Sequence, residues 1–310
     1  MEKVKVFAPA TVANVGSGFD ILGFALEAPG DIVEMKKTQQ KGIVISEMIS
    51  EKPLSCVIEE NTAGMALVNM YNSRDLSFGI ELKITKGVNP GSGTGSSAAS
   101  AAGAVFAFNQ LLDKDDKFTD KELVDFAMDG EVVASGTRHA DNVAPSVLGG
   151  FTLVRQNDPL DVIQIPTPSE MYVVVLHPEI EIKTSDSRAI LKKQIQLSDA
   201  VKQWGNVAGL VAGLFTDDYE LIGRSMEDYV VVPTRSLLIP MYDKLKEMAL
   251  ANGALGFSIS GSGPSVFALC KGKENAESVK KVLVETIEQT NLLYNIHISK
   301  VSTEGCKVIV

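Results

Sequence analysis

Between Asn89 and Ser97, three glycines alternate with small polar residues in the order Asn-Pro-Gly-Ser-Gly-Thr-Gly-Ser-Ser. Glycine allows a backbone to curl with successive N–H groups pointing inward, and it lacks the side chain that would block a ligand. The alanine-rich segment that follows predicts a buried helix over residues 96–112, whose unpaired N–H groups and positive dipole end attract an anion. Serine hydroxyls can donate to phosphate oxygens or bind a cation. The pattern therefore favours the phosphates of ATP, bound together with Mg²⁺.

This loop belongs to neither of two common nucleotide-binding types. No Gly-Lys-Ser/Thr follows the glycines, so it is not a Walker loop, and the Gly-x-Gly-x-x-Gly of dinucleotide-binding folds is absent. The alternative is a strand-to-helix turn capped by serine, but such a turn seldom contains three spaced glycines followed by Ser-Ser-Ala-Ala. The residues predicted to contact the nucleotide form one continuous run: Pro90, Gly91, Ser92, Gly93, Thr94, Gly95, Ser96, Ser97, Ala98, Ala99 and Ser100.

Two further segments are unusual. Residues 9–20 read Pro-Ala-Thr-Val-Ala-Asn-Val-Gly-Ser-Gly-Phe-Asp, and residues 260–265 read Ser-Gly-Ser-Gly-Pro-Ser. Taken alone, the first is equally a loop with Asn and Asp in turn positions, and the second is more typical of a hairpin turn. In this order, the three segments together resemble the signature of the GHMP small-molecule kinases. Within that superfamily, the first segment is most similar to the homoserine kinases.

The resemblance spans residues 9–270 and implies both a fold and an activity. The implied fold is α+β and two-lobed, with a ribosomal-S5-like, ATP-binding lobe over residues 1–160 and a ferredoxin-like lobe over residues 161–310. The implied activity is ATP-dependent phosphorylation of the side-chain hydroxyl of L-homoserine, giving O-phospho-L-homoserine on the route to threonine. Two alternatives stay open, namely a superfamily kinase acting on an isoprenoid or a sugar, and a non-catalytic ligand sensor on the same fold.

The resemblance also assigns the residues around the phosphates. Ser97 and Glu131 correspond to the serine and glutamate that hold Mg²⁺, a hard cation that prefers oxygen ligands and keeps several waters. Asn142 and Thr184 join them as catalytic residues, with Thr184 near the γ-phosphate or the acceptor hydroxyl, and Asn61 lies near adenine. From the residues alone, a glutamate such as Glu131 is more often a solvated helix carboxylate, and Asn61 is equally a helix cap. Thr94 departs from the pattern, because the family usually has leucine there.

A homoserine pocket must bind a zwitterion, which requires a carboxylate for the ammonium group and a guanidinium for the carboxylate group. Arginine suits the second role because its planar fork pairs bidentately, although a lone arginine is more often a surface residue. In mevalonate kinase and galactokinase an aspartate is the base, and Asn142 stands in its place here. The resemblance therefore implies catalysis by positioning and charge stabilisation, with no dedicated base. The predicted substrate contacts are Asn14, Asp20, His139, Asp141, Arg188, Arg235 and Gly261.

The overall composition excludes several classes of binding partner. The net charge is -10, from 29 basic and 39 acidic residues, which disfavours nucleic acid and anionic membranes. No stretch approaches the roughly 18 apolar residues of a membrane-spanning helix, and the first residues do not read as a signal peptide. The three cysteines are isolated, which argues against disulfides and a zinc site. We expect a cytoplasmic enzyme with a small-molecule substrate, and a homodimer is compatible with this.

The apolar pattern predicts the elements that position these residues. In the first half it indicates strands over 3–8, 31–37, 42–46, 78–85 and 149–155, with the first strand ending at Pro9. Helices are expected over 61–72, 96–112 and 119–134, the last with a capping box of Thr119 and Glu122. The polar stretch 156–170 contains three prolines and is a candidate lobe boundary. The second half is expected to form strands over 171–177, 254–259, 265–270 and 294–301 and helices over 200–215, 217–229, 239–251 and 275–290, an order typical of a ferredoxin-like sandwich.

Overall fold

The first two strands form a long antiparallel hairpin that crosses the molecule. β1 (Lys3–Val15) pairs with β2 (Gly18–Thr38) from Lys3 opposite Lys36 to Val15 opposite Gly18. The expectation that the first strand ends at Pro9 was wrong. The ladder shifts its register between Pro9 and Thr11, and such an irregularity lets a strand pass a residue that has no N–H to donate. The distinctive segment 9–20 therefore lies mostly in strands.

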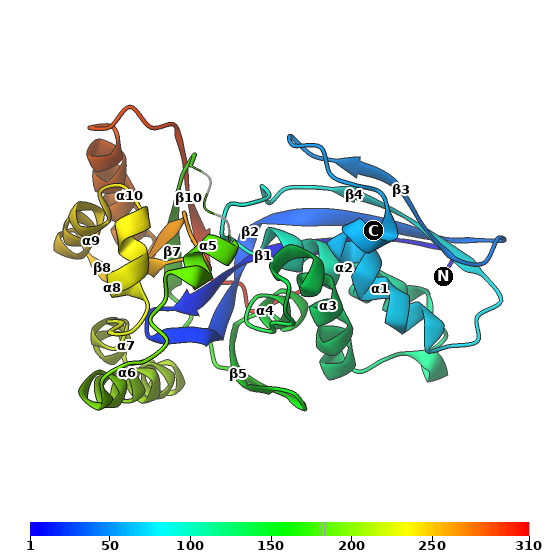
Figure 1. Cartoon of the computed structure of the whole chain (residues 1–310), viewed down its shortest axis with the longest axis horizontal. Helices are drawn as coiled ribbons and strands as arrows, with labels where there is room; N and C mark the ends of the chain where they lie inside the picture. The colour runs from blue at the N-terminus through cyan, green and yellow to red at the C-terminus, as the bar shows by residue number, and fades with distance from the viewer. Residues whose placement is uncertain (181, 183, 310) are drawn as a thin grey trace.

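The computed structural model describes residues 1–180, 182 and 184–309, without the side chains of Thr184 and Ser185 (Figure 1). The elements that follow the hairpin are β3 (Ile43–Ile49), α1 (Thr62–Asn72), β4 (Gly79–Thr85), α2 (Ser96–Leu111), α3 (Asp120–Ser135), α4 (Val143–Leu148), β5 (Phe151–Asn157), β6 (Leu160–Ile165), β7 (Met171–Pro178), α5 (Thr184–Ala189), α6 (Leu197–Thr216), α7 (Tyr219–Arg224), α8 (Val232–Arg235), α9 (Tyr242–Ala251), β8 (Ala254–Ile259), β9 (Val266–Lys271), α10 (Lys273–Ile287), β10 (Tyr294–Lys300) and β11 (Lys307–Val308).

The first half of the chain builds a mixed sheet with helices on one side. The order β11-β1-β2-β4-β3 forms its main path, and β5 pairs with β2 and β6. Helices α1 to α4 lie together on one side of this sheet (Figure 1). The three predicted helices of this half are confirmed, including the capping box at Thr119 and Glu122. The short helix α4, which contains Pro145, was not predicted.

The second half forms a separate antiparallel sheet in the order β10-β7-β9-β8, against which α9 and α10 pack. Numbered along the chain, these four strands lie in the order 4-1-3-2, so the ferredoxin-like lobe is confirmed. The helix expected over 217–229 is only α7, because the chain after Arg224 turns against the β1–β2 hairpin, where the Ser17 hydroxyl donates to the Ser225 carbonyl at 3.0 Å.

One hydrophobic cluster spans both halves of the chain, and a second cluster lies within the second half alone. The ring of Phe24 on β2 lies 4.9 Å from that of Phe151 and 5.8 Å from that of Phe267 on β9, measured between centroids. The polar stretch 156–170 contains β6, and the end of the chain returns to the first sheet as β11. The division near residue 160 stays a prediction. No helix among the described residues is long and apolar enough to cross a membrane.

Candidate active site

The glycine-serine loop connects β4 to α2 and requires its glycines. Gly93 and Gly95 have φ values of 78° and 68°, in the left-handed region that other residues avoid. A Cβ atom at Gly93 would lie 2.9 Å from two carbonyl oxygens, and one at Gly95 only 2.0 Å from the Thr11 hydroxyl. Gly95 also precedes α2, and no side chain caps the first N–H groups of that helix. These donors are therefore available to an anion.

The third motif supports the loop from the other half of the chain. The Ser260 hydroxyl donates to the Gly93 carbonyl at 2.7 Å, and the Ser265 hydroxyl donates to the Ser92 carbonyl. The Ser92 and Thr94 hydroxyls bond to each other at 2.7 Å, and both residues are buried. These two side chains therefore turn into the protein and are not available to a ligand.

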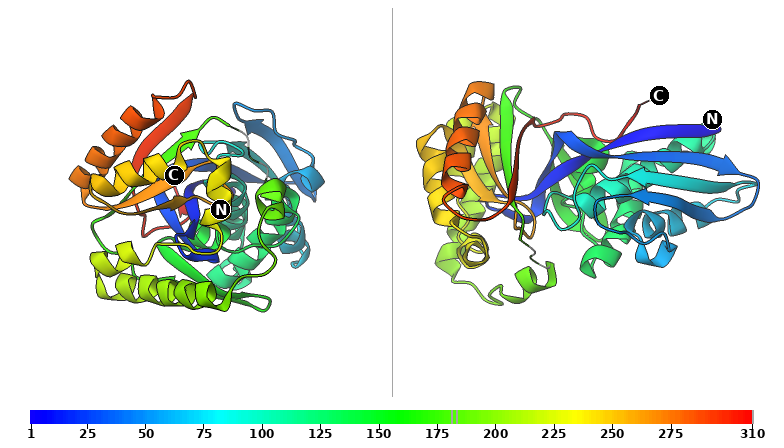
Figure 2. Two further views of the ribbon diagram at one scale, coloured as in Figure 1. Left: turned by 60° about the vertical axis from the view of Figure 1, so that its left-hand side comes forward. Right: turned by 90° about the horizontal axis from the view of Figure 1, so that it is seen from above.

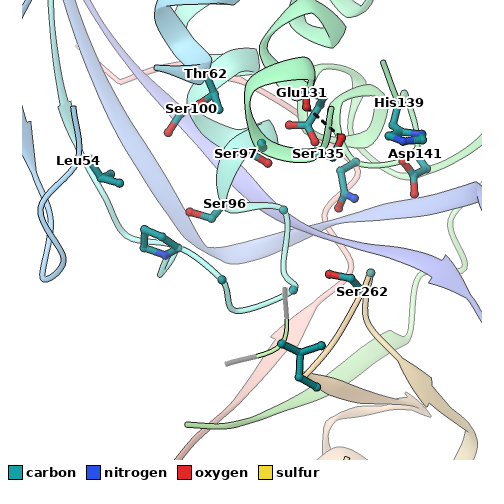
Figure 3. Close-up of a pocket in the computed structure, with 18 of the residues that line it drawn as sticks. Leu54, Thr62, Ser96, Ser97, Ser100, Glu131, Ser135, His139, Asp141 and Ser262 are labelled. Atoms are coloured by element: carbon teal, nitrogen blue, oxygen red, sulfur yellow. Dashed lines mark hydrogen bonds between the residues drawn. The ribbon is translucent and has the colours of Figure 1, made fainter. Parts of the chain in front are cut away.

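A cavity of about 590 Å³ lies between the loop and the distinctive segments of both halves (Figure 3). Ser92, Thr94, Ala98 and Ala99 were predicted as nucleotide contacts but do not line it, and the last two are buried in the core. The side chain of Thr184 lies outside the described part of the structure. The other predicted site residues line this one cavity: Asn14, Asp20, Asn61, Pro90, Gly91, Gly93, Gly95, Ser96, Ser97, Ser100, Glu131, His139, Asp141, Asn142, Arg188, Arg235 and Gly261.

Ser97 at the start of α2 and Glu131 on α3 lie side by side in this cavity (Figure 3). Burial raises the pKa of Glu131 to about 7, against the lowering effect of a hydrogen bond from Ser97 and of the charge on Lys86. One Glu131 carboxylate oxygen, Oε1, is buried with no hydrogen-bond partner among the described residues. A buried carboxylate oxygen beside a hydroxyl, close to a phosphate loop, fits the oxygen ligands of a hard cation. The described residues contain no larger cluster of His, Cys, Asp and Glu that could hold a metal.

Asp20 and Arg188 form the charged end of the cavity. The Arg188 guanidinium donates to both Asp20 carboxylate oxygens, at 3.0 and 2.9 Å, and also to His139 Nε2 at 3.2 Å. Burial and the charge of Arg188 lower the pKa of His139. His139 Nε2 accepts the bond from Arg188, because a guanidinium can only donate. Asp20 and Asn14 both have positive φ, near 60°, and the Asn14 side-chain oxygen accepts from the Asp20 N–H at 2.8 Å. The hairpin thus holds Asp20 in an unusual backbone conformation, as is common at functional sites.

Arg235 adds a second guanidinium that is almost fully buried. It donates to the backbone carbonyls of Ser187 and Gly261, each at 3.1 Å. Burial, followed by the charge of Arg188, lowers the pKa of Arg235 to about 10. The Phe19 ring lies beside both guanidinium groups, with its centroid 5.0 Å from the Arg235 Cζ and 5.8 Å from the Arg188 Cζ. This ring position favours two neighbouring cations.

Asp141 and Asn142 line the cavity between its two ends. Burial, followed by the charges of Asp20 and Glu131, raises the pKa of Asp141 to about 7. The Asn142 side-chain oxygen accepts from the Thr11 hydroxyl at 2.8 Å, which leaves the amide NH₂ group as the donor for a ligand. At the far end, Asn61 caps α1 by accepting from two of its backbone N–H groups. The cap interpretation of Asn61 is therefore correct, and the residue also faces the cavity.

Sequence reasoning missed a buried ion pair beneath the loop. Lys86 donates to the Asp31 carboxylate, to the Ser96 carbonyl at 2.7 Å and to the Ser100 hydroxyl at 2.8 Å. Asp31 also accepts from the backbone N–H groups of residues 87 and 88. A lysine between the last strand residue and the first loop glycine was the available signal for Lys86, whereas nothing marked Asp31 within its strand.

Gln203 on α6 was also not predicted, and it connects two segments near the charged end of the cavity. Its side-chain NH₂ donates to the Ser17 carbonyl at 2.7 Å, and its oxygen accepts from the Tyr229 N–H at 2.9 Å. The preceding residue, Asp228, accepts from three N–H groups at and just before the start of α8, the helix that ends with Arg235. Gln203 is therefore a positioning residue for both the Asp20 hairpin and the Arg235 helix.

The GHMP kinase family models match this chain in both halves. The model described as "GHMP kinases N terminal domain" matches residues 61–150, and that described as "GHMP kinases C terminal" matches residues 210–289. A curated homoserine kinase of Chloroherpeton thalassium is 46% identical over 321 residues, covering 100% of both chains. The chain belongs to the homoserine kinase family of GHMP kinases. GHMP kinases use ATP, in agreement with the predicted phosphate loop.

Solved structures agree with this family. The crystal structure of homoserine kinase from Cytophaga hutchinsonii superposes with a TM-score of 0.95 at 48% identity, covering 100% of this chain and 98% of that one. L. major mevalonate kinase, solved in complex with R-mevalonate, has a TM-score of 0.70 at 17% identity, with 96% and 95% coverage. At that identity the second likeness shows the fold alone. The predicted two-lobed GHMP kinase fold is confirmed.

Proposed function

We propose that this kinase transfers the γ-phosphoryl group of ATP to the side-chain hydroxyl of L-homoserine. The observation that carries the assignment of the acceptor is the cluster of Asp20, Arg188 and Arg235, which lines the same cavity as the phosphate loop. A carboxylate and two guanidinium groups match the ammonium and carboxylate groups of an amino acid. An isoprenoid or sugar acceptor lacks that pair of charges. The similarity to curated homoserine kinases supports the same acceptor.

The nucleotide end of the cavity binds the triphosphate. The backbone N–H groups of the loop and of the first turn of α2 donate to phosphate oxygens, and the helix dipole favours their negative charge. Ser97 and Glu131 hold Mg²⁺, which when bound neutralises charge on the phosphates. Lys86 fixes the start of α2 from below, because it binds the Ser96 carbonyl and the Ser100 hydroxyl. The cavity extends to Met48, Leu54 and Thr62, which gives the adenine a partly apolar wall.

The acceptor end orients homoserine between the two halves of the chain. Asp20 attracts the ammonium group, and Arg188 and Arg235 attract the carboxylate, so the side-chain hydroxyl is directed toward the γ-phosphate. The bond from the hydroxyl oxygen to phosphorus then forms while the bond to the departing ADP oxygen breaks, and the hydroxyl proton passes to an oxygen of the transferred phosphoryl group. Asn142 offers an amide donor and no base, so transfer depends on positioning and charge stabilisation.

The direct test measures ADP release with ATP and Mg²⁺ for four acceptors: L-homoserine, mevalonate, galactose and shikimate. We expect turnover with L-homoserine alone. Normal ATP binding without ADP release on adding L-homoserine would show that the assignment is wrong. Glu131→Ala should abolish Mg²⁺-dependent turnover while L-homoserine still binds, and unchanged activity would contradict the metal ligand.

The variant Arg235→Leu distinguishes an amino-acid acceptor, whose carboxylate needs the guanidinium, from an isoprenoid or sugar acceptor, which does not. Losing a charge-assisted hydrogen bond of about 1.5–3 kcal/mol lowers kcat/KM for homoserine roughly 10- to 150-fold. The matched variant Arg235→Lys keeps the charge but not the planar fork, and we expect an intermediate loss. ATP binding should be the same in both variants, because Arg235 lies at the acceptor end. Equal activity of the leucine variant and the parent would remove Arg235 from the acceptor site.

A further inference from the structure

His177, near the end of β7, contacts a residue that supports the glycine-serine loop. β7 lies in the sheet of the second half, which stands at one end of the molecule in Figure 1 and in the right view of Figure 2. The Nδ1 atom of His177 lies 3.1 Å from the Ser265 hydroxyl oxygen, and the Ser265 hydroxyl donates to the Ser92 carbonyl of the loop. Ser265 is buried and His177 is half-buried, outside the lining of the cavity.

The direction of these two hydrogen bonds follows from the chemistry of Ser265. A serine hydroxyl has one proton, which Ser265 gives to the Ser92 carbonyl, so its oxygen accepts the bond from His177. His177 Nδ1 therefore carries a proton. Burial lowers the pKa of His177, whereas the charge of Glu179 and a hydrogen bond to the Ser92 carbonyl raise it. A ring N–H that points toward the loop agrees with this second effect.

The Ser92 carbonyl shares a peptide group with the Gly93 N–H. In a planar trans peptide the C=O and the N–H point in opposite directions, so a bond that holds the carbonyl also sets the direction of the N–H. The Ser92 carbonyl points to the buried Ser265, whereas Gly93 lines the cavity. Among the described residues, the Gly93 N–H has no hydrogen-bond acceptor. A backbone donor of this kind needs a partner, which a phosphate oxygen can supply.

The next two loop carbonyls are held in the same manner. The Gly93 carbonyl accepts from the Ser260 hydroxyl at 2.7 Å, and the Thr94 carbonyl accepts from the Thr11 N–H at 3.1 Å. Together with the Ser92 carbonyl, three consecutive carbonyls are bound by donors outside the loop. Rotation of the peptide groups between them is therefore restricted, and the loop N–H groups keep their directions before a ligand binds.

We propose that His177 is a positioning residue for ATP, which acts through Ser265 to hold the Gly93 N–H toward the phosphates. Hydrogen bonds in a chain polarise one another, so the N–H of His177 strengthens the bond that Ser265 makes to the loop. A donor that is already oriented binds its ligand at a lower entropic cost. This role rests on the proposed binding of the triphosphate at the loop, and it does not depend on the identity of the acceptor.

His297 on the neighbouring strand β10 provides a matched control. It lies opposite Val175, two residues before His177, so the two histidines share one face of the sheet. Burial lowers the pKa of His297 as well, but its Nε2 atom has no hydrogen-bond partner among the described residues. A general effect of replacing a half-buried histidine would appear at both positions, whereas an effect through Ser265 would appear only at His177.

Isothermal titration of the full chain with ATP and Mg²⁺ tests this role. The amide of glutamine reaches the position of Nε2, so His177→Gln keeps a polar side chain but misplaces the donor to Ser265. Loss of one neutral hydrogen bond should raise the Kd for ATP about 2- to 12-fold. The amide of asparagine reaches the position of Nδ1, so His177→Asn should bind ATP nearly as tightly as the parent. His297→Gln should not change the Kd. Because no acceptor is present, a wrong assignment of the acceptor would not alter these values.

A double variant tests the route through Ser265. Ser265→Ala should raise the Kd for ATP at least as much as His177→Gln, and adding His177→Gln to it should change the Kd little further. Thermal unfolding of each variant establishes that it folds, and the asparagine and glutamine variants can be compared with each other at similar Tm. Equal Kd values for His177→Gln and His177→Asn would overturn the proposal. So would an equal rise in His297→Gln, and so would losses that multiply in the double variant.

Discussion

Replacing Glu131 by glutamine is expected to stabilise the metal-free protein at alkaline pH while removing a proposed Mg²⁺ ligand. The folded-state pKa of Glu131 is raised by burial from its usual 4.5 to about 7, so the folded protein binds this proton more tightly than the unfolded chain. Stability from this group is complete below pH 4.5 and is lost as the pH rises to about 7. The difference corresponds to about 3 kcal/mol, and Glu131 is buried enough that solvent screens little of it.

Glutamine has the same shape and no charge at any of these pH values. Urea unfolding in EDTA at pH 5 and pH 8 should therefore show that the advantage of Glu131→Gln over the parent grows by about 3 kcal/mol between the two pH values. With the unfolding entropy of a 310-residue chain, this corresponds to roughly 5 °C in Tm. Comparison with the parent cancels most of the contribution of Asp141, whose pKa is also about 7.

The control is Glu122→Gln on the same helix. Hydrogen bonds with Thr119 lower the pKa of Glu122, so this carboxylate is ionised in the folded protein at both pH values, and the effect of its replacement should not change between them. Mg²⁺ with ATP should raise the Tm of the parent more at pH 8 than at pH 5, and should have little effect on Glu131→Gln. An advantage of Glu131→Gln that is equal at pH 5 and pH 8 would refute the reasoning.

Three other outcomes are expected. Gln203→Leu leaves two backbone hydrogen-bonding groups unpaired. In initial-rate assays, the KM for homoserine should therefore rise about 10-fold or more while the KM for ATP stays constant. A proportional change in both constants would argue for a general loss of folding. Lys86→Met leaves the buried Asp31 unpaired and should lower the free energy of unfolding by about 3–5 kcal/mol in urea titrations, and adding Asp31→Asn should restore part of it. Asp20→Asn should raise the KM for homoserine by roughly 10- to 150-fold. Because Asp20 pairs with Arg188, we expect the affinity for homoserine to fall, and isothermal titration with homoserine measures that affinity.

The phosphate loop could be predicted because glycine identity reports directly on backbone conformation. A Cβ atom at Gly93 or Gly95 would collide with its neighbours. The glycines in the sequence therefore indicate the backbone conformation of the loop. The residues proposed to bind Mg²⁺ and the acceptor were a different case. Nothing local joins Asp20 to Arg188, which lie 168 residues apart, and only the family resemblance placed them together.

Other features lay beyond sequence reasoning for physical reasons. The Lys86–Asp31 pair depends on the alignment of β2 with β4, which no single-strand pattern encodes. The passage of β1 through Pro9 depends on a register shift that the partner strand permits. The shortening of the helix over 217–229 follows from contacts with the distant hairpin. In each case a tertiary contact overrides the local preference.

The hydrogen bonds from Ser260 and Ser265 to the glycine loop have a consequence for the synthesis of the chain. The loop carbonyls of Gly93 and Ser92 find these hydroxyl donors only in residues made more than 160 positions later. During synthesis on the ribosome, the first half of the chain therefore contains the loop glycines but lacks the two hydroxyl donors that support the loop. We therefore expect ATP to stabilise such a partial product less than the chain in which both halves have emerged and met.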